Sequence, residues 1–218
     1  MEPTQPMRYT AEHKARTRLK ILEQASQALR SQGPNAVSVA TVMADAGLTH
    51  GGFYVHFDSK DALIEASIAK MFEDSHALWY RATRDRSPAE GLARYIDLYL
   101  CARHIGERER GCPVAALSSD VPRLSRSAQV AFEQGLRTLT ALISQSLEAL
   151  GRPKPVKLAS SVLSELVGCI CLARLQTSRR AALDLLQGSR SCLRDRLSLS
   201  NACKSVDKSM EVANHEAR

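Results

Sequence analysis

The residues best suited to bind a charged partner gather in one short stretch of the chain. They are Thr49, His50, Gly51, Gly52, Tyr54, His56 and Lys60. Glycines are poor helix formers, and one reason to place two of them at a helix start is close approach of backbone amides to an anion. The phenol, imidazole and ammonium groups that follow are donors suited to phosphate oxygens. The chemistry that these residue types indicate is binding of a polyanion.

The segments around these residues have the pattern of a helix-turn-helix between Ser38 and Phe57. Ser38 suits a helix N-cap, Gly47 suits the tight turn, and Leu48 would fill the space beneath it. In such a motif the start of the second helix enters the major groove of DNA, which would bring residues 49–52 to the bases. A loop between two helices of a generic bundle is the competing interpretation.

The net charge gives this interpretation little support. The chain carries a formal charge of +7 and has a pI of about 9.3, which fits a polyanionic partner. Residues 1–60, however, hold seven basic against five acidic side chains, whereas residues 121–218 hold fifteen against eight. The excess of positive charge therefore lies away from the stretch that would bind DNA.

Helical periodicity runs from Ala11 to about Leu199, and no alternating strand pattern accompanies it. The sequence predicts an all-α fold of about nine helices, with glycine, proline and serine residues at their ends. The predicted ranges are 11–32, 39–46, 50–57, 60–84, 88–104, 113–120, 123–150, 157–177 and 179–199.

A longer pattern resembles a known protein family. A helix ending in A-L-R-S-Q-G-P-N-A-V-S-V, followed by V-M-A-D-A-G-L-T-H-G-G-F-Y-V-H-F-D-S-K-D-A-L, closely resembles the TetR family of regulators over about Lys14 to Ala66. The resemblance implies an all-α homodimer, usually a repressor. It also implies a DNA-binding head at residues 10–58 and an effector-binding and dimerising domain at residues 59–199. Residues 200–218 are polar, and we expect a disordered tail there.

By the same resemblance, the DNA contacts fall on the residues that match the family pattern. They are Ser38, Thr49, Gly51, Tyr54, His56 and Lys60. His50 departs from the small or aliphatic residues often found at its position, so it either helps to set the operator sequence or is a solvated side chain at a helix start. The implied partners are a double-stranded DNA operator, a second copy of the chain and an unidentified small-molecule effector.

A second segment, R-G-C-P-V-A-A-L-S-S-D-V at residues 110–121, resembles a G-C-x-x-x-x-L motif of one TetR subgroup. Some members of that subgroup sense electrophiles or oxidants through the cysteine. A helix start and the cations Arg108 and Arg110 would lower the pKa of the Cys112 thiol. The alternative, which we favour, is that Cys112 is a small apolar plug between helices.

The effector pocket is expected among apolar and aromatic side chains with a few polar tips. The candidates are Phe72, His76, Trp79, Tyr95, Tyr99, Cys112, Phe132 and Leu136. Because no second strong acid or base lines this set, the pattern hints at a neutral or mildly polar aromatic ligand. Each aromatic residue, taken singly, is more typical of an ordinary core.

The last two predicted helices suit dimerisation, because each carries an apolar stripe that could pair with a symmetry mate. The candidate interface residues are Leu158, Val162, Leu166, Ile170, Leu185, Leu186 and Leu193. Burial of these stripes inside one chain is the competing account, and spacing alone does not decide between the two.

Other classes of protein fit less well. The sequence has no phosphate-cradling glycine loop, no metal-spaced Cys/His cluster and no G-x-S-x-G site, so we expect neither an enzyme nor a cofactor or metal. Six cysteines without a C-x-x-C pair suit a reducing cytosol. The segment before Ala11 has no apolar signal core, and the stretch from Leu163 to Leu175 is too short to span a bilayer. We therefore expect a cytoplasmic protein without a membrane partner, and the rival function is a helical adaptor that binds protein.

Overall fold

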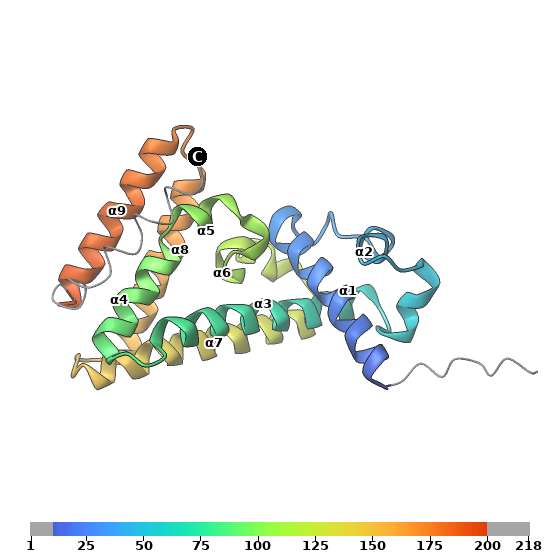
Figure 1. Cartoon of the computed structure of the whole chain (residues 1–218), viewed down its shortest axis with the longest axis horizontal. Helices are drawn as coiled ribbons and strands as arrows, with labels where there is room; N and C mark the ends of the chain where they lie inside the picture. Colours follow the sequence, from blue (N-terminus) through green and yellow to red (C-terminus); the bar gives the residue numbers. More distant parts are fainter. Residues whose placement is uncertain (1–10, 200–218) are drawn as a thin grey trace, which may run out of the picture.

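A computed structural model of the chain describes residues 11–199 as helices joined by short turns (Figure 1). Within this range there are nine α-helices and three 3-10 helices, which confirms the predicted all-α fold. In chain order they are α1 (Ala11–Gln32), α2 (Val39–Asp45), η1 (His50–Val55), α3 (Lys60–Thr83), α4 (Pro88–Tyr99), α5 (Ala102–Gly106), η2 (Arg108–Arg110), α6 (Pro113–Leu117), η3 (Val121–Arg123), α7 (Arg126–Ala149), α8 (Pro155–Arg174) and α9 (Arg179–Arg196). The expected tail at residues 200–218 lies outside the described residues.

Serine caps set several of these helix starts, as the sequence predicts. The side chains of Ser38, Ser59 and Ser87 each accept a hydrogen bond from a backbone amide in the first turn of the helix that follows. Ser87 and Glu90 form a reciprocal capping box at the start of α4, which satisfies two otherwise unpaired backbone donors. The helix ends that depend on local capping chemistry are therefore the best predicted.

The single helix predicted over residues 88–104 is wrong, because the chain breaks it into α4 and α5. Leu100 leaves the helical conformation with a ψ of 61° and is buried. The imidazole Nδ1 of His104 lies 2.8 Å from the carbonyl oxygen of Tyr99, which takes the place of a helical hydrogen bond. No glycine or proline marks this break, so it depends on burial and on a side chain that folds back.

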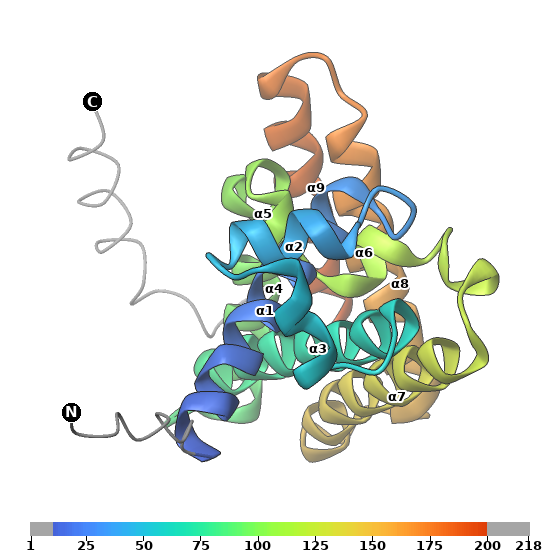
Figure 2. The ribbon, with the colours of Figure 1, turned by 90° about the vertical axis from the view of Figure 1, so that its right-hand side faces the viewer.

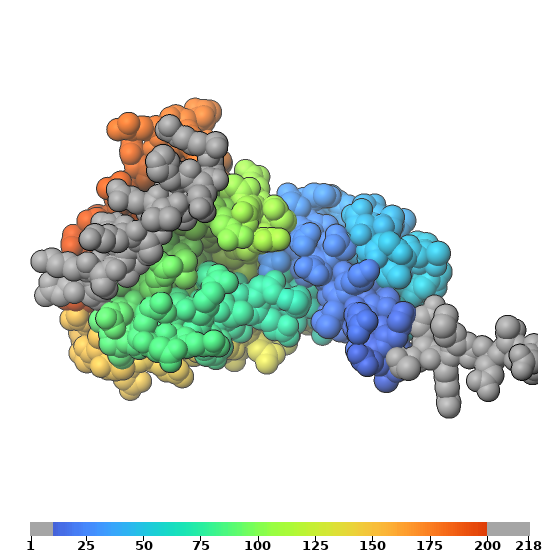
Figure 3. All heavy atoms as spheres, viewed as in Figure 1, coloured from blue at the N-terminus to red at the C-terminus, as the bar shows by residue number. Residues whose placement is uncertain are grey.

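The two longest helices, α3 and α7, lie side by side along the molecule, and α1 with the short helices α2 and η1 forms a head at one end (Figures 1 and 2). At the opposite end, α8 and α9 pack on α4 and α7. The space-filling view shows that α1 meets the region of α5 and η2 where the head joins the rest of the chain (Figure 3).

The apolar interior is divided into two clusters, and the division does not follow the predicted boundary at residue 58. The head cluster includes Ile21, Leu29 and Met43, and it also takes Ile68 and Phe72 from α3. The first half of α3 is therefore part of the packing of the head, so a movement of α3 is coupled to the head directly.

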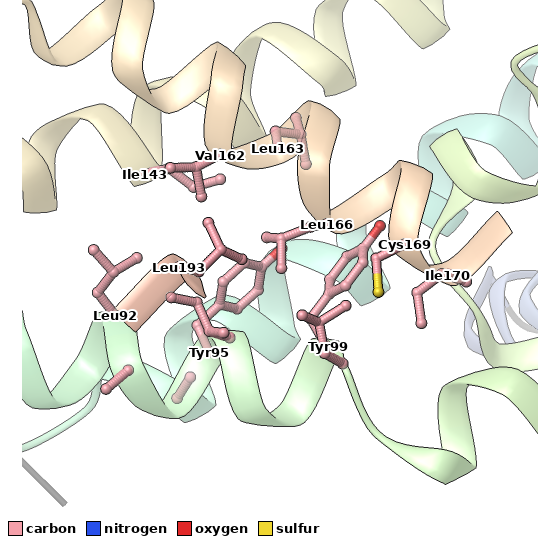
Figure 4. Packing of buried hydrophobic residues seen from close by; sticks show 14 of the residues in the cluster. Leu92, Tyr95, Tyr99, Ile143, Val162, Leu163, Leu166, Cys169, Ile170 and Leu193 are labelled. Carbon is pink, nitrogen blue, oxygen red and sulfur yellow. The ribbon is translucent and has the colours of Figure 1, made fainter. Parts of the chain in front are cut away.

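The second cluster fills the space between α4, α7, α8 and α9 (Figure 4). The rings of Tyr95 and Tyr99 rise from α4 toward α8, where Leu166 and Ile170 face them. These four side chains are at most 1% exposed. An aliphatic core thus closes around two tyrosines.

This packing corrects the expectation for the dimer interface. Five of the seven candidates are at most 1% exposed in the single chain, namely Val162, Leu166, Ile170, Leu186 and Leu193. Leu158 and Leu185 are partly buried against the same cluster. The apolar stripes of α8 and α9 cover the core of their own chain, which was the competing account, so a partner would have to meet the opposite faces.

The helix α8 is the one described helix that is long and apolar enough to cross a bilayer, with a mean hydropathy of 1.7 over 18 residues. This differs from the expectation that no stretch is long enough. Core helices of soluble proteins meet the same criterion, and seven residues of α8 are buried in the chain.

Candidate DNA-binding site and adjoining hollow

The turn between α2 and η1 has the geometry that the sequence predicts. Gly47 adopts a φ of +70°, a left-handed conformation that glycine takes without steric cost. The amide of Leu48 donates to the carbonyl of Met43, and the amide of Gly47 donates to that of Ala44. This pair of bonds is a Schellman motif, and it fixes the direction in which η1 leaves α2.

The second helix of the motif is a 3-10 helix, His50–Val55, which ends two residues before the predicted end at Phe57. Gly51 and Gly52 in its first turn disfavour an α-helix, and the tighter form is common in short segments. Thr49, His50 and Gly51 at its start are all exposed, and the Thr49 hydroxyl makes no capping bond. Donors at the start of η1 therefore face outward.

The anchors of η1 point the other way. Phe53 and Phe57 are buried, with their ring centroids 5.8 Å apart. Tyr54, between them, is 67% exposed, and Lys60 is exposed at the first position of α3. Ser38 is exposed as well, but its hydroxyl is occupied as the N-cap of α2. The structure therefore brings the seven predicted DNA contacts to the head, where Ser38 already has a structural role.

His56 has an unusual electrostatic setting. Burial lowers the pKa of its imidazole, and the positive charges of Lys14, Arg18 and His13 lower it further. Its Nδ1 is buried without a hydrogen-bond partner within residues 11–199. A phosphate oxygen could therefore meet this ring only through Nε2.

The structure adds residues from α1 that the motif did not indicate. The guanidinium of Arg18 lies over the ring of Phe57, with its carbon 4.7 Å from the ring centroid. Lys14 is one turn earlier on the same helix, and both side chains are exposed. The run H-K-A-R-T-R-L-K could have signalled a basic helix, but its position beside His56 depends on how α1 crosses η1.

A hollow of about 410 Å³ opens between α1, α3, α4, α5 and η2. Of the eight predicted effector contacts, Tyr95, Tyr99 and Cys112 line it. The other polar and charged lining residues are Glu23, Ser26, Gln27, Arg30, Lys70, Asp74, Ser75, Arg81, Cys101, Arg103, His104, Glu107, Glu109 and Arg110. Such a wall favours a polar, charged molecule over the neutral aromatic ligand that the sequence suggested.

The remaining predicted contacts do not line this hollow: three are buried and two, His76 and Leu136, are partly buried. Phe72 and Phe132 meet edge to face in the head cluster, with centroids 5.1 Å apart. Trp79 packs against the buried ring of Tyr95 at 4.8 Å. His76 reaches the carbonyl of Gly135, and Leu136 is partly buried against both clusters.

His104 organises the inner end of the hollow. Its Nδ1 faces the Tyr99 carbonyl at 2.8 Å, and its Nε2 accepts a hydrogen bond from the Cys112 amide at 3.0 Å. A neutral ring with its proton on Nδ1 satisfies both contacts. Burial, with a smaller contribution from Arg174, lowers the pKa of His104 to about 4, so the ring is neutral near pH 7.

The thiol of Cys112 is buried beside the Tyr99 hydroxyl, which makes no hydrogen bond of regular geometry within the described residues. Burial raises the pKa of this thiol and outweighs the Tyr99 hydroxyl and the nearby backbone amides, which favour the thiolate. A reactive thiolate requires the opposite shift. In this conformation Cys112 therefore has the character of an apolar plug.

The neighbouring residues of the G-C-x-x-x-x-L segment also have packing roles. A Cβ atom on Gly111 would come within 2.8 Å of the Arg174 guanidinium, and Leu117 is completely buried. The Arg174 side chain donates to the His104 carbonyl at 2.9 Å. The segment joins α8 to the wall of the hollow.

Arg30 joins the hollow to the head. Its side chain is 3% exposed, and its Nη2 donates to Asp74 at 2.8 Å and to the Met71 carbonyl at 3.3 Å. Its Nη1 reaches the carbonyl of Glu109 in η2 at 3.4 Å. One guanidinium therefore ties α1 to both α3 and η2, across the wall of the hollow.

Comparison with known proteins supports the prediction for the head. Residues 21–67 match the family model described as bacterial regulatory proteins of the tetR family. The matched range runs from α1 through the turn and η1 into the first third of α3. It contains all seven predicted DNA contacts.

Curated relatives and solved structures extend this similarity. The chain is 27% identical to the HTH-type transcriptional repressor NemR of Escherichia coli K12 over 137 residues, which are 61% of this chain and 67% of that protein. It is 30% identical to the regulator TtgR of Pseudomonas putida over 86 residues, or 39% of this chain and 40% of TtgR. A crystal structure of reduced E. coli NemR has a TM-score of 0.73 at 20% identity and covers 83% of this chain and 97% of that one. The head of the chain therefore matches the tetR family model, and the chain shares its fold with solved transcriptional regulators of that family.

Proposed function

We propose that this protein is a transcriptional regulator of the TetR family, a repressor that binds a near-palindromic operator as a homodimer and is released by a small-molecule effector. The observation that carries the proposal is the outward-facing start of η1, with Thr49, His50 and Gly51 exposed beside Tyr54 and Lys60. Such a helix start enters the major groove in helix-turn-helix proteins. The repressor NemR, to which the chain is similar, supports the direction of control.

In this proposal the start of η1 contacts bases, and the surrounding side chains hold phosphates. His50 is the exposed side chain best placed to distinguish base edges, because its imidazole can both donate and accept. Tyr54 and Lys60 act on the sugar-phosphate backbone, which fixes orientation without sequence information. A symmetric dimer then presents two such heads to two half-sites.

The proposed effector site is the hollow beside Arg30. The effector would be a polar molecule whose inner end meets Tyr95 and Tyr99 and whose charged groups meet the rim. Because Arg30 holds α1 to α3 and η2, a ligand that displaces this guanidinium would change the setting of the head. To shift the ratio of released to DNA-binding conformation from about 1:99 to 99:1, the effector must bind the released conformation more tightly by roughly 5.5 kcal/mol.

Oxidant sensing through Cys112 is the weaker form of the same proposal. The E. coli NemR structure is described as a reduced form, which concerns that protein. Here burial and the raised pKa of Cys112 keep the thiol protonated. A ligand in the hollow is therefore the better-supported trigger.

The test is a gel-shift titration on the DNA upstream of the gene for this chain, with Tyr54→Phe and Lys60→Ala. We expect Tyr54→Phe to weaken binding about tenfold, because a hydrogen bond to a charged group contributes roughly 1.5–3 kcal/mol. Lys60→Ala should reduce the salt dependence by about 1.8 in log–log slope, because the dimer loses one phosphate contact at each of its two heads and each contact contributes about 0.9.

The matched controls are Tyr80→Phe, an exposed tyrosine near the far end of α3, and Arg137→Ala, an exposed cation on α7. Neither should change binding. If all four variants bind alike, the assignment of these contacts is wrong. Failure of the unaltered protein to bind any DNA at low salt would favour the adaptor function instead.

A further inference from the structure

We propose that the first turns of α1 form an additional DNA-backbone contact, in which Lys14 and Arg18 hold phosphates that flank the site occupied by η1. This inference rests on the proposed function, because it concerns the same DNA. It goes beyond the helix-turn-helix, since both residues precede the range 21–67 that matches the family model.

The geometry places these two cations on the rim of the DNA-binding face. Residues four apart on a helix share a face, so Lys14 and Arg18 lie one above the other. Arg18 stacks on Phe57, which is the anchor at the end of η1. The charges of both side chains act on His56, so the pair continues the line of donors from Tyr54 and His56.

Two positive side chains gather at this point without acidic partners in the described range, and their mutual repulsion would be relieved by a bound polyanion. Neither Lys14 nor Arg18 forms an ion pair with an acidic side chain among residues 11–199, although other surface cations of the chain do. Arg16, between them, is paired with Glu12. Like charges gathered without acidic neighbours raise the local potential and attract phosphates.

Arg18 is also held in place before any partner binds. A guanidinium over an aromatic ring is attracted by the negative face of the ring, and the ring of Phe57 is itself buried. A preorganised cation loses less side-chain entropy on binding than a free one. The surface is continuous with the proposed groove-binding residues, so the partner that fits it is duplex DNA.

The experiment measures binding to a mixed-sequence duplex over a range of salt concentrations. This probe is sufficient because phosphate contacts do not depend on sequence. Each lost phosphate contact reduces the log–log salt slope by about 0.9. Because every substitution is present in both chains of the proposed dimer, we expect Lys14→Ala to lose about 1.8 in slope and the Lys14→Ala/Arg18→Ala double variant to lose about 3.6.

The matched control is Lys20→Ala, an exposed lysine on the same helix that is not among the groups acting on His56. It should leave the slope unchanged. Arg18→Lys keeps the charge and should retain most of the slope, which separates loss of a phosphate contact from loss of packing on Phe57. Lys14→Ala leaves the contact between Arg18 and Phe57 intact, so it tests the phosphate contact even if the double variant folds poorly.

Two outcomes distinguish this inference from the proposed function. A double variant that binds with the slope of the unaltered protein, or a Lys20→Ala effect as large as that of Lys14→Ala, would overturn the inference and leave the proposed function standing. If the unaltered protein binds no duplex even at low salt, both are overturned together.

Discussion

At the scale of the residue, His104 shows how one buried side chain can hold a wall of the hollow. Its ring accepts from the Cys112 amide and meets the Tyr99 carbonyl, and it packs edge to face on the Tyr99 ring at 4.6 Å. Protonation of Nε2 would set two N–H groups against each other at the Cys112 contact. The neutral ring is therefore a structural requirement of this part of the fold.

A pH dependence of stability follows from this requirement. The pKa of His104 is lowered to about 4 in the folded chain from an unfolded value of 6.5, so the unfolded state binds the extra proton first as pH falls. Stability should be intact above about pH 6.5 and should decrease toward pH 4, by at most about 3 kcal/mol. Urea unfolding at several pH values measures this loss.

The control is His104→Gln, whose amide can still meet the Cys112 amide and does not titrate. Between pH 6.5 and pH 4, His104→Gln should therefore lose much less unfolding free energy than the unaltered protein, because the contribution of His104 is absent. Asp97 and His56 also have shifted pKa values, but they are common to both proteins and cancel in the comparison. Identical pH profiles would show that His104 is not the group responsible.

At the scale of the element, η1 contains a glycine, Gly51, that lowers helical stability and leaves its backbone exposed. A Cβ atom on Gly51 would have no heavy atom of the protein within 4 Å, and its φ is not positive. Nothing within the described chain therefore requires glycine at this position. In the proposed function, glycine is required here because DNA approaches the backbone closely.

Gly51→Ala should therefore separate folding from binding. We expect its thermal stability to be unchanged or raised by up to about 1 kcal/mol, because alanine is the better helix former. Affinity for DNA should fall, since a methyl group would occupy the space of the approaching phosphate or base. Gly188→Ala on α9, which also has open space around it, should raise stability without affecting DNA binding. Tight binding by Gly51→Ala would argue that the amides of η1 do not lie against DNA.

At the scale of the whole molecule, the proposed homodimer requires a face that can meet a second copy, and we place it on α8. The inward stripe is occupied by the chain's own core, and only 39% of the apolar window of α8 is buried. The outward face carries Ser160 and Ser164, whose hydroxyls bond to carbonyls of their own helix, together with Leu172, which is 54% exposed. Small residues with satisfied hydroxyls allow close helix packing, so we place the dimer contact here.

Ser164→Arg should convert the dimer to a monomer, because a guanidinium at a packed helix interface is bulky and costly to desolvate. Light scattering with size-exclusion chromatography measures the mass. Thr138→Arg on the exposed face of α7, beside Val130, is the control and should remain dimeric. Monomers from Thr138→Arg and not from Ser164→Arg would move the interface to α7.

The sequence by itself determined the parts of this protein that depend on local chemistry. Serine caps at Ser38 and Ser59 and the left-handed turn at Gly47 are set by residues within a few positions, and the TetR pattern is built from them. The proteins that the chain resembles are transcriptional regulators, in agreement with the expectation that it is not an enzyme. These features needed no information about distant residues.

The tertiary structure decided what covers each face and which charges meet. Periodicity identified the apolar stripe of α8 but not its partner, and the stripe closed over Tyr95 and Tyr99 of its own chain. The overall charge of the head is low, yet folding sets Lys14 and Arg18 of α1 beside His56, as only the crossing of α1 over η1 can do. Burial and charge depend on neighbours distant in sequence, which is why the hollow and its polar wall could not be predicted.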